Sequence, residues 1–202
     1  LNPDTVDHGE NTAVGSLSGY YMTTGTGNTC IGYASTATGA NNLLTGDNNT
    51  VIGANAESGN SAASNRLVLG YGATGDGDNS VVLGNSDVDN VYMSEDKAAT
   101  VHCGAVTEGS SLEIKKNISE IESPLDKITK LRGIEFDYKE SNKHSIGMIA
   151  EEVNEVFPEL VTKNPDGEVE AMSYSRMTAV LLEAIKELNQ EVKELKMKTR
   201  SN

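Results

Sequence analysis

A short frame that ends in glycine recurs five times in the first half of the chain. In each copy a polar residue precedes a short apolar stretch and the closing glycine, and these glycines lie 17, 21, 17 and 14 residues apart. The frames are residues 11–15, 28–32, 49–53, 66–70 and 80–84. Each predicts a strand of about three to five residues followed by a glycine that permits a turn. Strands this short bury no core alone, so we expect successive coils to stack as a β-helix or β-roll.

The segments between the frames are rich in Gly, Asn, Asp and Ser, which is typical of turns. A flexible linker is the alternative interpretation, but a linker would not place Val, Ile or Leu before glycine five times. Residues 90–93 and 100–103 are interpreted as degenerate strands that continue the stack.

No pattern in the sequence predicts a metal or a cofactor. Four aspartates in the turns lack the nonapeptide spacing of calcium-binding β-rolls, so we expect solvated turns. They are Asp76, Asp78, Asp87 and Asp89. Cys30 and Cys103 lie in neither a CxxC motif nor a cluster of metal-ligand spacing.

Composition divides the chain after Gly109. Residues 1–109 hold 17 of the 20 glycines, whereas residues 110–202 hold 14 of the 16 Lys and Arg residues. We therefore predict a β-repeat fibre segment over 1–109 and a second domain over 110–202. The net charge of -14 argues against nucleic acid or an anionic membrane as a partner, since both are bound by clustered basic residues. The apolar runs are too short for membrane insertion. The first residue, Leu1, suggests a piece of a longer protein.

The second domain is predicted to mix helices and strands. Apolar spacing suggests a helix over 118–131 that Pro124 breaks or restarts. Further patterns predict strands at 133–138 and 144–149, a helix over 151–156, and two short strands near 160–161 and 169–170.

The end of the chain has the heptad pattern of a coiled coil, over about residues 174–200. The two core series are Leu181, Leu188 and Leu195, and Ile185 and Val192, with Thr178 and Thr199 at the ends. Mixed charges between them, Glu187 included, are interpreted as a solvated outer surface.

Three blocks of sequence carry a resemblance to a known family. They are Gly-Ser-Ser-Leu-Glu-Ile-Lys-Lys-Asn-Ile at 109–118, Gly-Met-Ile-Ala-Glu-Glu-Val-Asn-Glu-Val-Phe-Pro-Glu-Leu-Val at 147–161, and Ala-Val-Leu-Leu-Glu-Ala-Ile-Lys-Glu-Leu at 179–188. In this order they resemble the C-terminal intramolecular chaperone domain of phage tail spikes and fibres, the S74 peptidase family. The glycine frames, over roughly residues 9–105, resemble the repeats of trimeric phage fibres and of trimeric bacterial adhesin heads.

The resemblance implies that a serine and a lysine cut the chain directly after the serine. The family's usual opening is Ser-Asp-x-Arg-x-Lys-x-Asn-Ile, and matching Lys-x-Asn-Ile places the pair at Ser110 and Lys115. Ser111 and Lys116 keep the same spacing but break the Asn-Ile match. The predicted cleavage site is therefore the Ser110–Ser111 bond.

The chemistry of such a pair sets its own requirements. A serine hydroxyl attacks well only after a base removes its proton, and a lysine is a base only where burial lowers its pKa enough to keep the amine neutral. A spacing of five residues suits a turn entering a helix, where backbone N–H groups would hold the oxyanion. Apart from the family pattern, a serine before a helix is more often an N-cap.

Two positions depart from the family pattern. Ser111 stands where the family has Asp, and Glu113 where it usually has Arg. A carboxylate beside an amine favours the charged form, which opposes its use as a base. An uncleaved precursor, slow cleavage and an inactivated variant all stay open.

Other candidate sites are weaker. Glu151 and Glu152 resemble paired catalytic carboxylates only in number, because adjacent helix positions point in different directions, so structural roles are expected. His144 is expected to be a loop residue without a triad.

The resemblance implies a homotrimer of mixed fold, in which a β-helical fibre segment precedes an α+β chaperone domain that ends in a long coiled-coil helix. The chaperone would bring three fibre segments together and then leave by autoproteolysis, so the chain is an enzyme only in the self-processing sense. The fibre would belong to a virion and meet a host cell-surface receptor, glycan or protein. The alternative is a cleavage-inactive, permanent trimerisation domain of a fibre or adhesin-like surface protein.

Overall fold

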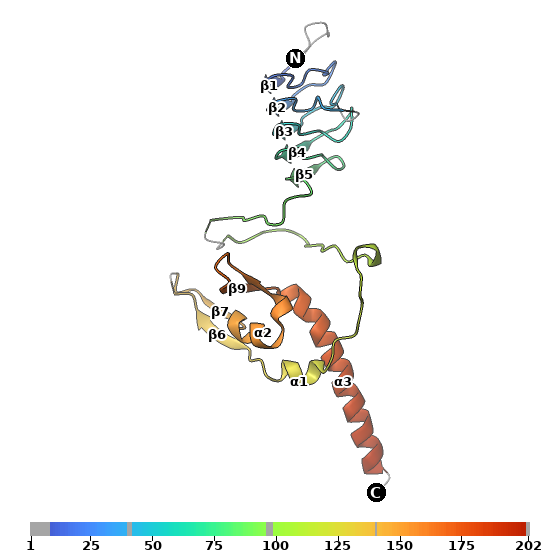
Figure 1. Ribbon diagram of the computed structural model, residues 1–202, viewed down its shortest axis with the longest axis vertical. Helices are drawn as coiled ribbons and strands as arrows, with labels where there is room; N and C mark the ends of the chain where they lie inside the picture. Colours follow the sequence, from blue (N-terminus) through green and yellow to red (C-terminus); the bar gives the residue numbers. More distant parts are fainter. Residues whose placement is uncertain (1–8, 40–41, 96–98, 140, 201–202) are drawn as a thin grey trace. The chain divides into compact units, whose positions relative to one another are not determined.

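The computed structural model describes residues 9–39, 42–95, 99–139 and 141–200. The described residues form two compact units, which divide between Val106 and Thr107 (Figure 1). We call them the solenoid unit and the helical unit and describe each by itself. The mixed fold predicted from the sequence, with a repetitive β part before an α+β part, is confirmed.

The solenoid unit is built on one parallel sheet whose five strands follow the order of the sequence. The strands are β1 (Thr12–Val14), β2 (Thr29–Ile31), β3 (Thr50–Ile52), β4 (Arg66–Leu69) and β5 (Ser80–Leu83). Each strand ends directly before the closing glycine of its frame. The five strands predicted from the glycine frames are therefore confirmed, and each belongs to one coil of the stack.

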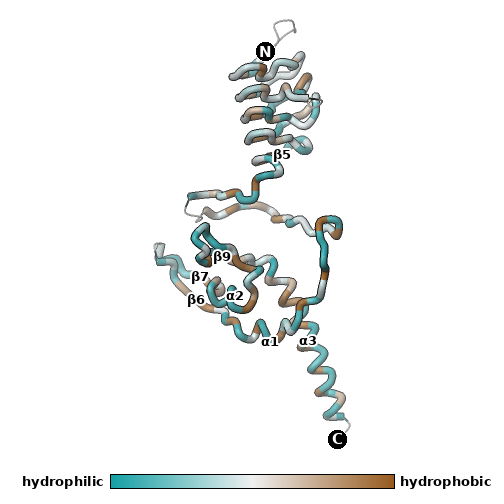
Figure 2. Tube along the Cα trace, viewed as in Figure 1, coloured by the Kyte–Doolittle hydropathy of each residue, from teal (hydrophilic) through white to brown (hydrophobic). Residues whose placement is uncertain are grey.

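Every strand pairs in register with the next, so equivalent side chains form columns along the stack. Cys30 lies beside Val51, and Val51 lies beside Val68. All three side chains are fully buried and fill the interior of the coils. Short hydrophobic segments recur accordingly in successive coils (Figure 2). Because side chains alternate across a strand, the residues on either side of each buried one point outward.

The closing glycine of each coil is required by the close approach of the next coil. Gly32 has a φ of 128°, in the region that favours glycine, and a Cβ at this position would lie 2.6 Å from the carbonyl oxygen of Gly53. No other residue fits there without separating the two coils, which explains why the frame ends in glycine.

A ladder of asparagines lies along the same stack, with Asn28 and Asn49 fully buried and Asn11 half-buried. Asn28 donates its backbone N–H to Asn11 Oδ1 at 2.7 Å, and Asn49 donates to Asn28 Oδ1 at 2.9 Å. Arg66 donates its backbone N–H to Asn49 Oδ1 at 3.1 Å. The guanidinium of Arg66 bonds Asp78 Oδ1 at 2.6 Å. Buried polar groups are tolerated only when bonded, and the ladder bonds each one to the neighbouring coil.

The stack ends after β5, so the prediction of further strands at 90–93 and 100–103 is wrong: neither segment is a strand, and the described residues in both are exposed. The chain turns instead, with Val88 N–H donating to Asn85 O. The side chain of Val88 then lies against Gly84, where a further coil would have to stack. This contact explains why the repeats stop before the end predicted from the resemblance, residue 105.

The helical unit contains two small antiparallel hairpins and three α-helices among its described residues. Its elements in order are η1 (Leu112–Ile114), α1 (Pro124–Ile128), β6 (Ile134–Asp137), β7 (His144–Gly147), α2 (Ala150–Val156), η2 (Pro158–Leu160), β8 (Val161–Lys163), β9 (Val169–Met172) and α3 (Tyr174–Arg200). The predicted hairpin strands and the short helix before Phe157 are confirmed. In the segment between β6 and β7, Glu140 lies outside the described residues.

The predicted helix over 118–131 is shorter than expected. Only Pro124–Ile128 is α-helical, and residues 115–123 before it are irregular, with positive φ at Asn117 and Ser123. Proline fits the first position of a helix but clashes with a preceding helical turn. Pro124 therefore starts the helix, which is one of the two outcomes predicted for this position.

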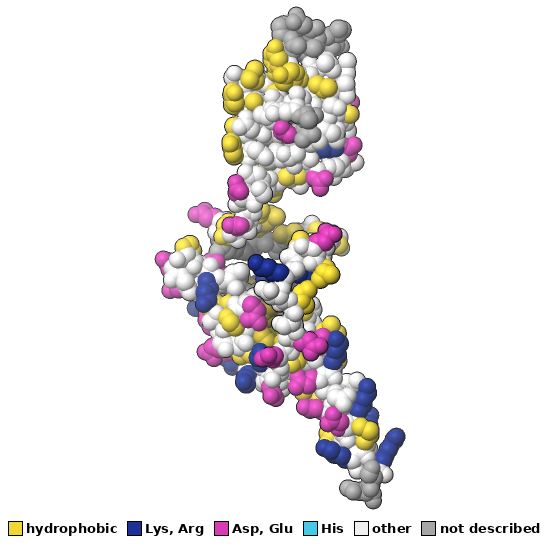
Figure 3. All heavy atoms as spheres, turned by 45° about the vertical axis from the view of Figure 1, so that its right-hand side comes forward, with side chains coloured by type: hydrophobic (Ala, Val, Ile, Leu, Met, Phe, Trp, Pro, Cys, Tyr) yellow, Lys and Arg dark blue, Asp and Glu magenta, His cyan; other side chains and the backbone are white. Residues whose placement is uncertain are grey.

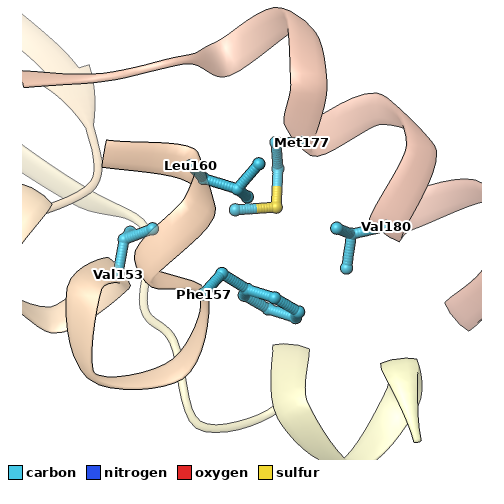
Figure 4. Packing of buried hydrophobic residues seen from close by; sticks show 5 residues of the cluster. All are labelled: Val153, Phe157, Leu160, Met177 and Val180. Atoms are coloured by element: carbon cyan, nitrogen blue, oxygen red, sulfur yellow. The ribbon is translucent and has the colours of Figure 1, made fainter. Parts of the chain in front are cut away.

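The core of the helical unit lies where α2 and η2 meet the start of α3. Five buried side chains form it: Val153, Phe157, Leu160, Met177 and Val180 (Figure 4). Phe157 and Leu160 come from the Val-Phe-Pro-Glu-Leu block, so this block supplies the centre of the fold.

Helix α3 has two apolar faces. Met177, Val180 and Ala184 are buried in its own unit. The five predicted heptad residues are 37 to 63 % exposed. They are Leu181, Ile185, Leu188, Val192 and Leu195, which we call the seam. The helix therefore buries one apolar face within the chain and leaves the seam uncovered by the described residues.

Glu187 departs from the solvated role predicted for it. Its carboxylate accepts the backbone N–H of Leu125 at 3.0 Å, so α3 caps the start of α1. Ser123, at the N-cap position of α1, makes no side-chain cap bond. The first turn of a helix leaves N–H groups without partners, and Glu187 supplies the acceptor from a helix distant in sequence.

We expect Glu187→Ala to loosen α1, because Leu125 loses its acceptor. The loss of a helix cap costs about 1 kcal/mol, which corresponds to roughly fivefold faster amide exchange in α1. Hydrogen-exchange mass spectrometry on the full chain measures this. Glu191→Ala, at an exposed position further along α3, is the matched control and should leave α1 unchanged. Equal exchange in the two variants would contradict this role.

Candidate active site

A single turn of 3-10 helix organises the predicted serine and lysine. The turn η1 spans Leu112–Ile114, and Ser111 is its N-cap, with the hydroxyl accepting the backbone N–H of Glu113 at 3.3 Å. At the other end, Lys115 donates its backbone N–H to Leu112 O at 3.1 Å. The turn reverses the chain, so residues just before and just after it are brought close together.

Ser110 and Lys115 meet across this turn. The Nζ atom of Lys115 donates a hydrogen bond to Ser110 Oγ at 2.7 Å. This distance suits proton transfer between a nucleophile and its base, provided the amine is neutral. Both residues belong to the same chain, so the structure needs no second chain to bring the two side chains together.

The bond predicted to be cut lies at the same place. Ser111 follows Ser110 directly and holds an extended backbone, with φ of -60° and ψ of 146°. Its hydroxyl is occupied as the cap of η1, which is a role that Asp, the residue usual in the family, also performs. The replacement of Asp by Ser therefore conserves the cap while it removes a negative charge.

Two N–H groups at the start of η1 are already bonded within the turn. Glu113 N–H is held by Ser111 Oγ, and Ile114 N–H donates to Ser111 O at 3.3 Å. These donors would have to be released, or others supplied, before an oxyanion could be held here.

The site is open to solvent within one chain. Every residue from 101 to 120 is exposed. Three large apolar side chains near the pair are 67 to 72 % exposed, namely Leu112, Ile114 and Ile118. A lysine serves as a base only in a buried environment, and the described residues of this chain do not supply such an environment around the pair.

The other candidate residues have structural partners. Glu152 forms a bidentate ion pair with Arg132, in which Arg132 Nη2 lies 2.7 Å from Glu152 Oε1. The hydrogen bond from Arg132 lowers the pKa of Glu152. His144, expected in a loop, lies in β7, where its Nδ1 is 3.0 Å from Asp137 Oδ1. The prediction of structural roles for the glutamates thus agrees with the contacts of Glu152, whereas the loop placement of His144 is wrong.

The aspartates of the solenoid turns do not gather into a metal site. Among the described residues, no three His, Cys, Asp or Glu side chains come together as metal ligands would. Asp78 accepts the backbone N–H of Ser64 at 3.0 Å and bonds Arg66, and these two partners lower its pKa, the Ser64 bond most. No helix within the described ranges is both long and apolar enough to cross a membrane.

The turn η1 lies near the start of a region that matches a known protein family. Residues 110–162 match the family described as chaperone of endosialidase. The match begins at Ser110, the first residue of the pair.

Curated relatives of the chain are phage fibre proteins. Long tail fiber protein Gp37 of Salmonella phage S16 is 28% identical over 144 residues, which cover 66% of this chain and 19% of that protein. Gp37 of Enterobacteria phage K3 is 33% identical over 97 residues, or 44% of this chain and 8% of its own length. Gp37 of Enterobacteria phage M1 is 34% identical over 104 residues, or 47% and 41%. The chain therefore spans less than half the length of these relatives.

The chain is thus similar over part of its length to phage long tail fiber proteins, and its residues 110–162 match the chaperone-of-endosialidase family. Sequence reasoning identified the pair through the family pattern alone. It had no signal for Glu187, because a carboxylate that caps a distant helix has the same sequence pattern as one on a solvated face.

Proposed function

We propose that this chain is part of a phage tail fibre or related virion appendage, and that its helical unit is an intramolecular chaperone. This unit brings three chains together, aligns their solenoids and is then released by cleavage at the Ser110–Ser111 bond. The released fibre meets a host cell-surface receptor, glycan or protein. The similarity to Gp37 and the match to the chaperone-of-endosialidase family support this role.

The observation that carries the proposal is the free seam of α3. Its opposite face is occupied by the core of the helical unit, whereas Leu181, Ile185, Leu188, Val192 and Leu195 are exposed at heptad spacing. Apolar residues in this pattern associate as a coiled coil. The family resemblance favours three strands. A coil this short is marginal alone, and the packing of α3 onto α1 and η2 holds it in place.

A stacked solenoid gives such a chaperone a task. Repeated parallel coils offer many registers that differ little in energy, and an unfinished stack exposes strand edges that aggregate. A trimer formed first at the helical unit would fix the relative position of three chains before their solenoids close. Release afterwards leaves a product that is kinetically stable.

The cleavage step uses the pair at η1. The neutral amine of Lys115 takes the hydroxyl proton of Ser110, whose Oγ adds to the carbonyl carbon of a Ser110–Ser111 bond. The C–N bond then breaks, the proton passes to the leaving amine of Ser111, and an ester remains on Oγ. Water hydrolyses this ester, which frees the hydroxyl and a new carboxylate.

Ring size decides which chain's bond can be attacked. If Ser110 Oγ added to the carbonyl carbon of its own residue, it would close a four-membered ring. The peptide bond of a neighbouring chain carries no such strain. The same neighbour would cover the exposed pair and favour a neutral amine. We therefore propose that the pair of one chain cuts the Ser110–Ser111 bond of another.

The alternative is a permanent trimer clamp that no longer cuts. Glu113 favours it, because an acidic residue stands there where the family usually has Arg, and so does the exposure of the pair.

Intact mass spectrometry of the full chain during incubation tests cleavage. We expect two fragments, one ending at Ser110 and one beginning at Ser111. Ser110→Ala and Lys115→Ala should abolish them, since one removes the nucleophile and the other its base. Lys116→Ala, the neighbouring lysine, is the matched control and should be cut like the parent. A single uncut mass in every sample would establish the clamp.

Mixed oligomers test whether cleavage passes between chains. We expect a tagged Ser110→Ala chain, co-expressed with the parent, to be cut after residue 110, because a neighbour supplies the nucleophile. Co-expression of Ser110→Ala with Lys115→Ala should give no cleavage, since Ser110 and Lys115 of one chain form the pair. Cleavage confined to the parent chain in the first mixture would refute attack between chains.

A further inference from the structure

The outward face of the solenoid sheet carries a continuous line of aliphatic side chains. Register places Val14 beside Ile31, Ile31 beside Ile52, Ile52 beside Leu69, and Leu69 beside Leu83. We call these five residues the outer column. Each follows an inward-pointing residue of its strand and therefore points away from the interior.

Three residues of the outer column are exposed in the single chain, whereas Ile31 and Leu69 are half-buried. Val14 is 55 % exposed, Ile52 37 % and Leu83 42 %. A second outward column runs beside it and adds Leu67 and Val81 at its end. Figure 3 shows hydrophobic side chains gathered along one side of the solenoid unit. Purely parallel sheets are almost always covered on both faces, and a contiguous exposed apolar patch marks an interaction surface.

The distribution of charge on the solenoid unit favours a second solenoid unit as the partner of the outer column. Residues 1–109 carry 12 acidic and 2 basic residues, yet the ten outward positions of β1 to β5 hold none of them. A second solenoid unit would be repelled by most of this surface, and the outer column is where it can approach without placing carboxylates together. A charged partner would instead lose its hydration there without gaining an ion pair.

The spacing of side chains along the outer column also favours a second solenoid unit as the partner. The side chains of the outer column repeat at the spacing of hydrogen-bonded strands, about 4.8 Å. A partner that fits each of them equally must have the same repeat, and another copy of this solenoid does. Two copies placed side by side with parallel axes set each coil against its equivalent.

We propose that the outer column is the surface through which the solenoid units of neighbouring chains pack, coil against equivalent coil. This inference rests on the proposed self-assembly of the chain and adds a second interface to the seam of α3. In a threefold arrangement the outer columns face a common axis, so Ile52 of one chain lies next to Ile52 of another.

Cysteine cross-linking of the full chain tests the surface. Ile52→Cys in a Cys103→Ser background is treated with a short bis-maleimide, and Leu83→Cys repeats the test at the last coil. Cys30 is buried, so it should not react with the cross-linker. Tyr71→Cys, at a position 69 % exposed in the turn after β4, is the matched control. We expect two-chain products at both column positions, reaching at most about two thirds of the chains, because one of three thiols is left over.

Native mass spectrometry of the same samples separates this proposal from the proposed function. A three-chain mass without cross-linking at Ile52→Cys and Leu83→Cys would overturn the outer column as an interface and leave the trimer standing. A single-chain mass would overturn both. Equal cross-linking at Tyr71→Cys would show unspecific contact and also overturn the outer column.

Discussion

Helix α3 is apolar on two sides, and one chain has a core for only one of them. Met177, Val180 and Ala184 are buried in the helical unit, which fixes the orientation of the helix. That packing leaves the seam, with Ile185 at 63 % and Leu195 at 62 % exposure, turned away from the core. Burying such residues stabilises by about 1.5 to 3 kcal/mol each, so a second chain that covered the seam would be held by the hydrophobic effect.

The solenoid sheet, like α3, has one apolar face that is buried and a second that is not, for a different reason. Its glycines allow the coils to stack, and the column through Cys30, Val51 and Val68 fills their interior. Alternation along each strand then places a second set of aliphatic residues outside. Stacking adjusts to any length and does not by itself choose a register between chains. A helical unit that associates first would set the register between chains. Cleavage by Ser110 and Lys115 would then remove the helical unit once the solenoids have formed.

Local patterns predicted most of the fold. The glycine frames gave all five solenoid strands, and heptad spacing gave α3 and its seam, because in both cases the repeat is written in the sequence. The end of the stack was missed, since Val88 closes it by packing on Gly84, a contact between residues that match no repeat. Glu187 was missed because its partner, Leu125, is distant in sequence. The pair at Ser110 and Lys115 was predicted from the family pattern and stays a prediction, whereas the contact between the two side chains and their exposure follow only from the structure.

In the proposed function, the seam assembles the chains. Native mass spectrometry after refolding from denaturant tests it most directly, using Ser110→Ala to keep the chain whole. We expect the three-chain species to return, and expect Leu188→Asp to remove most of it because a carboxylate cannot be buried in the seam. Met197→Asp, an exposed apolar position off the seam, should refold like the parent. Full recovery of three-chain protein in Leu188→Asp would contradict the account.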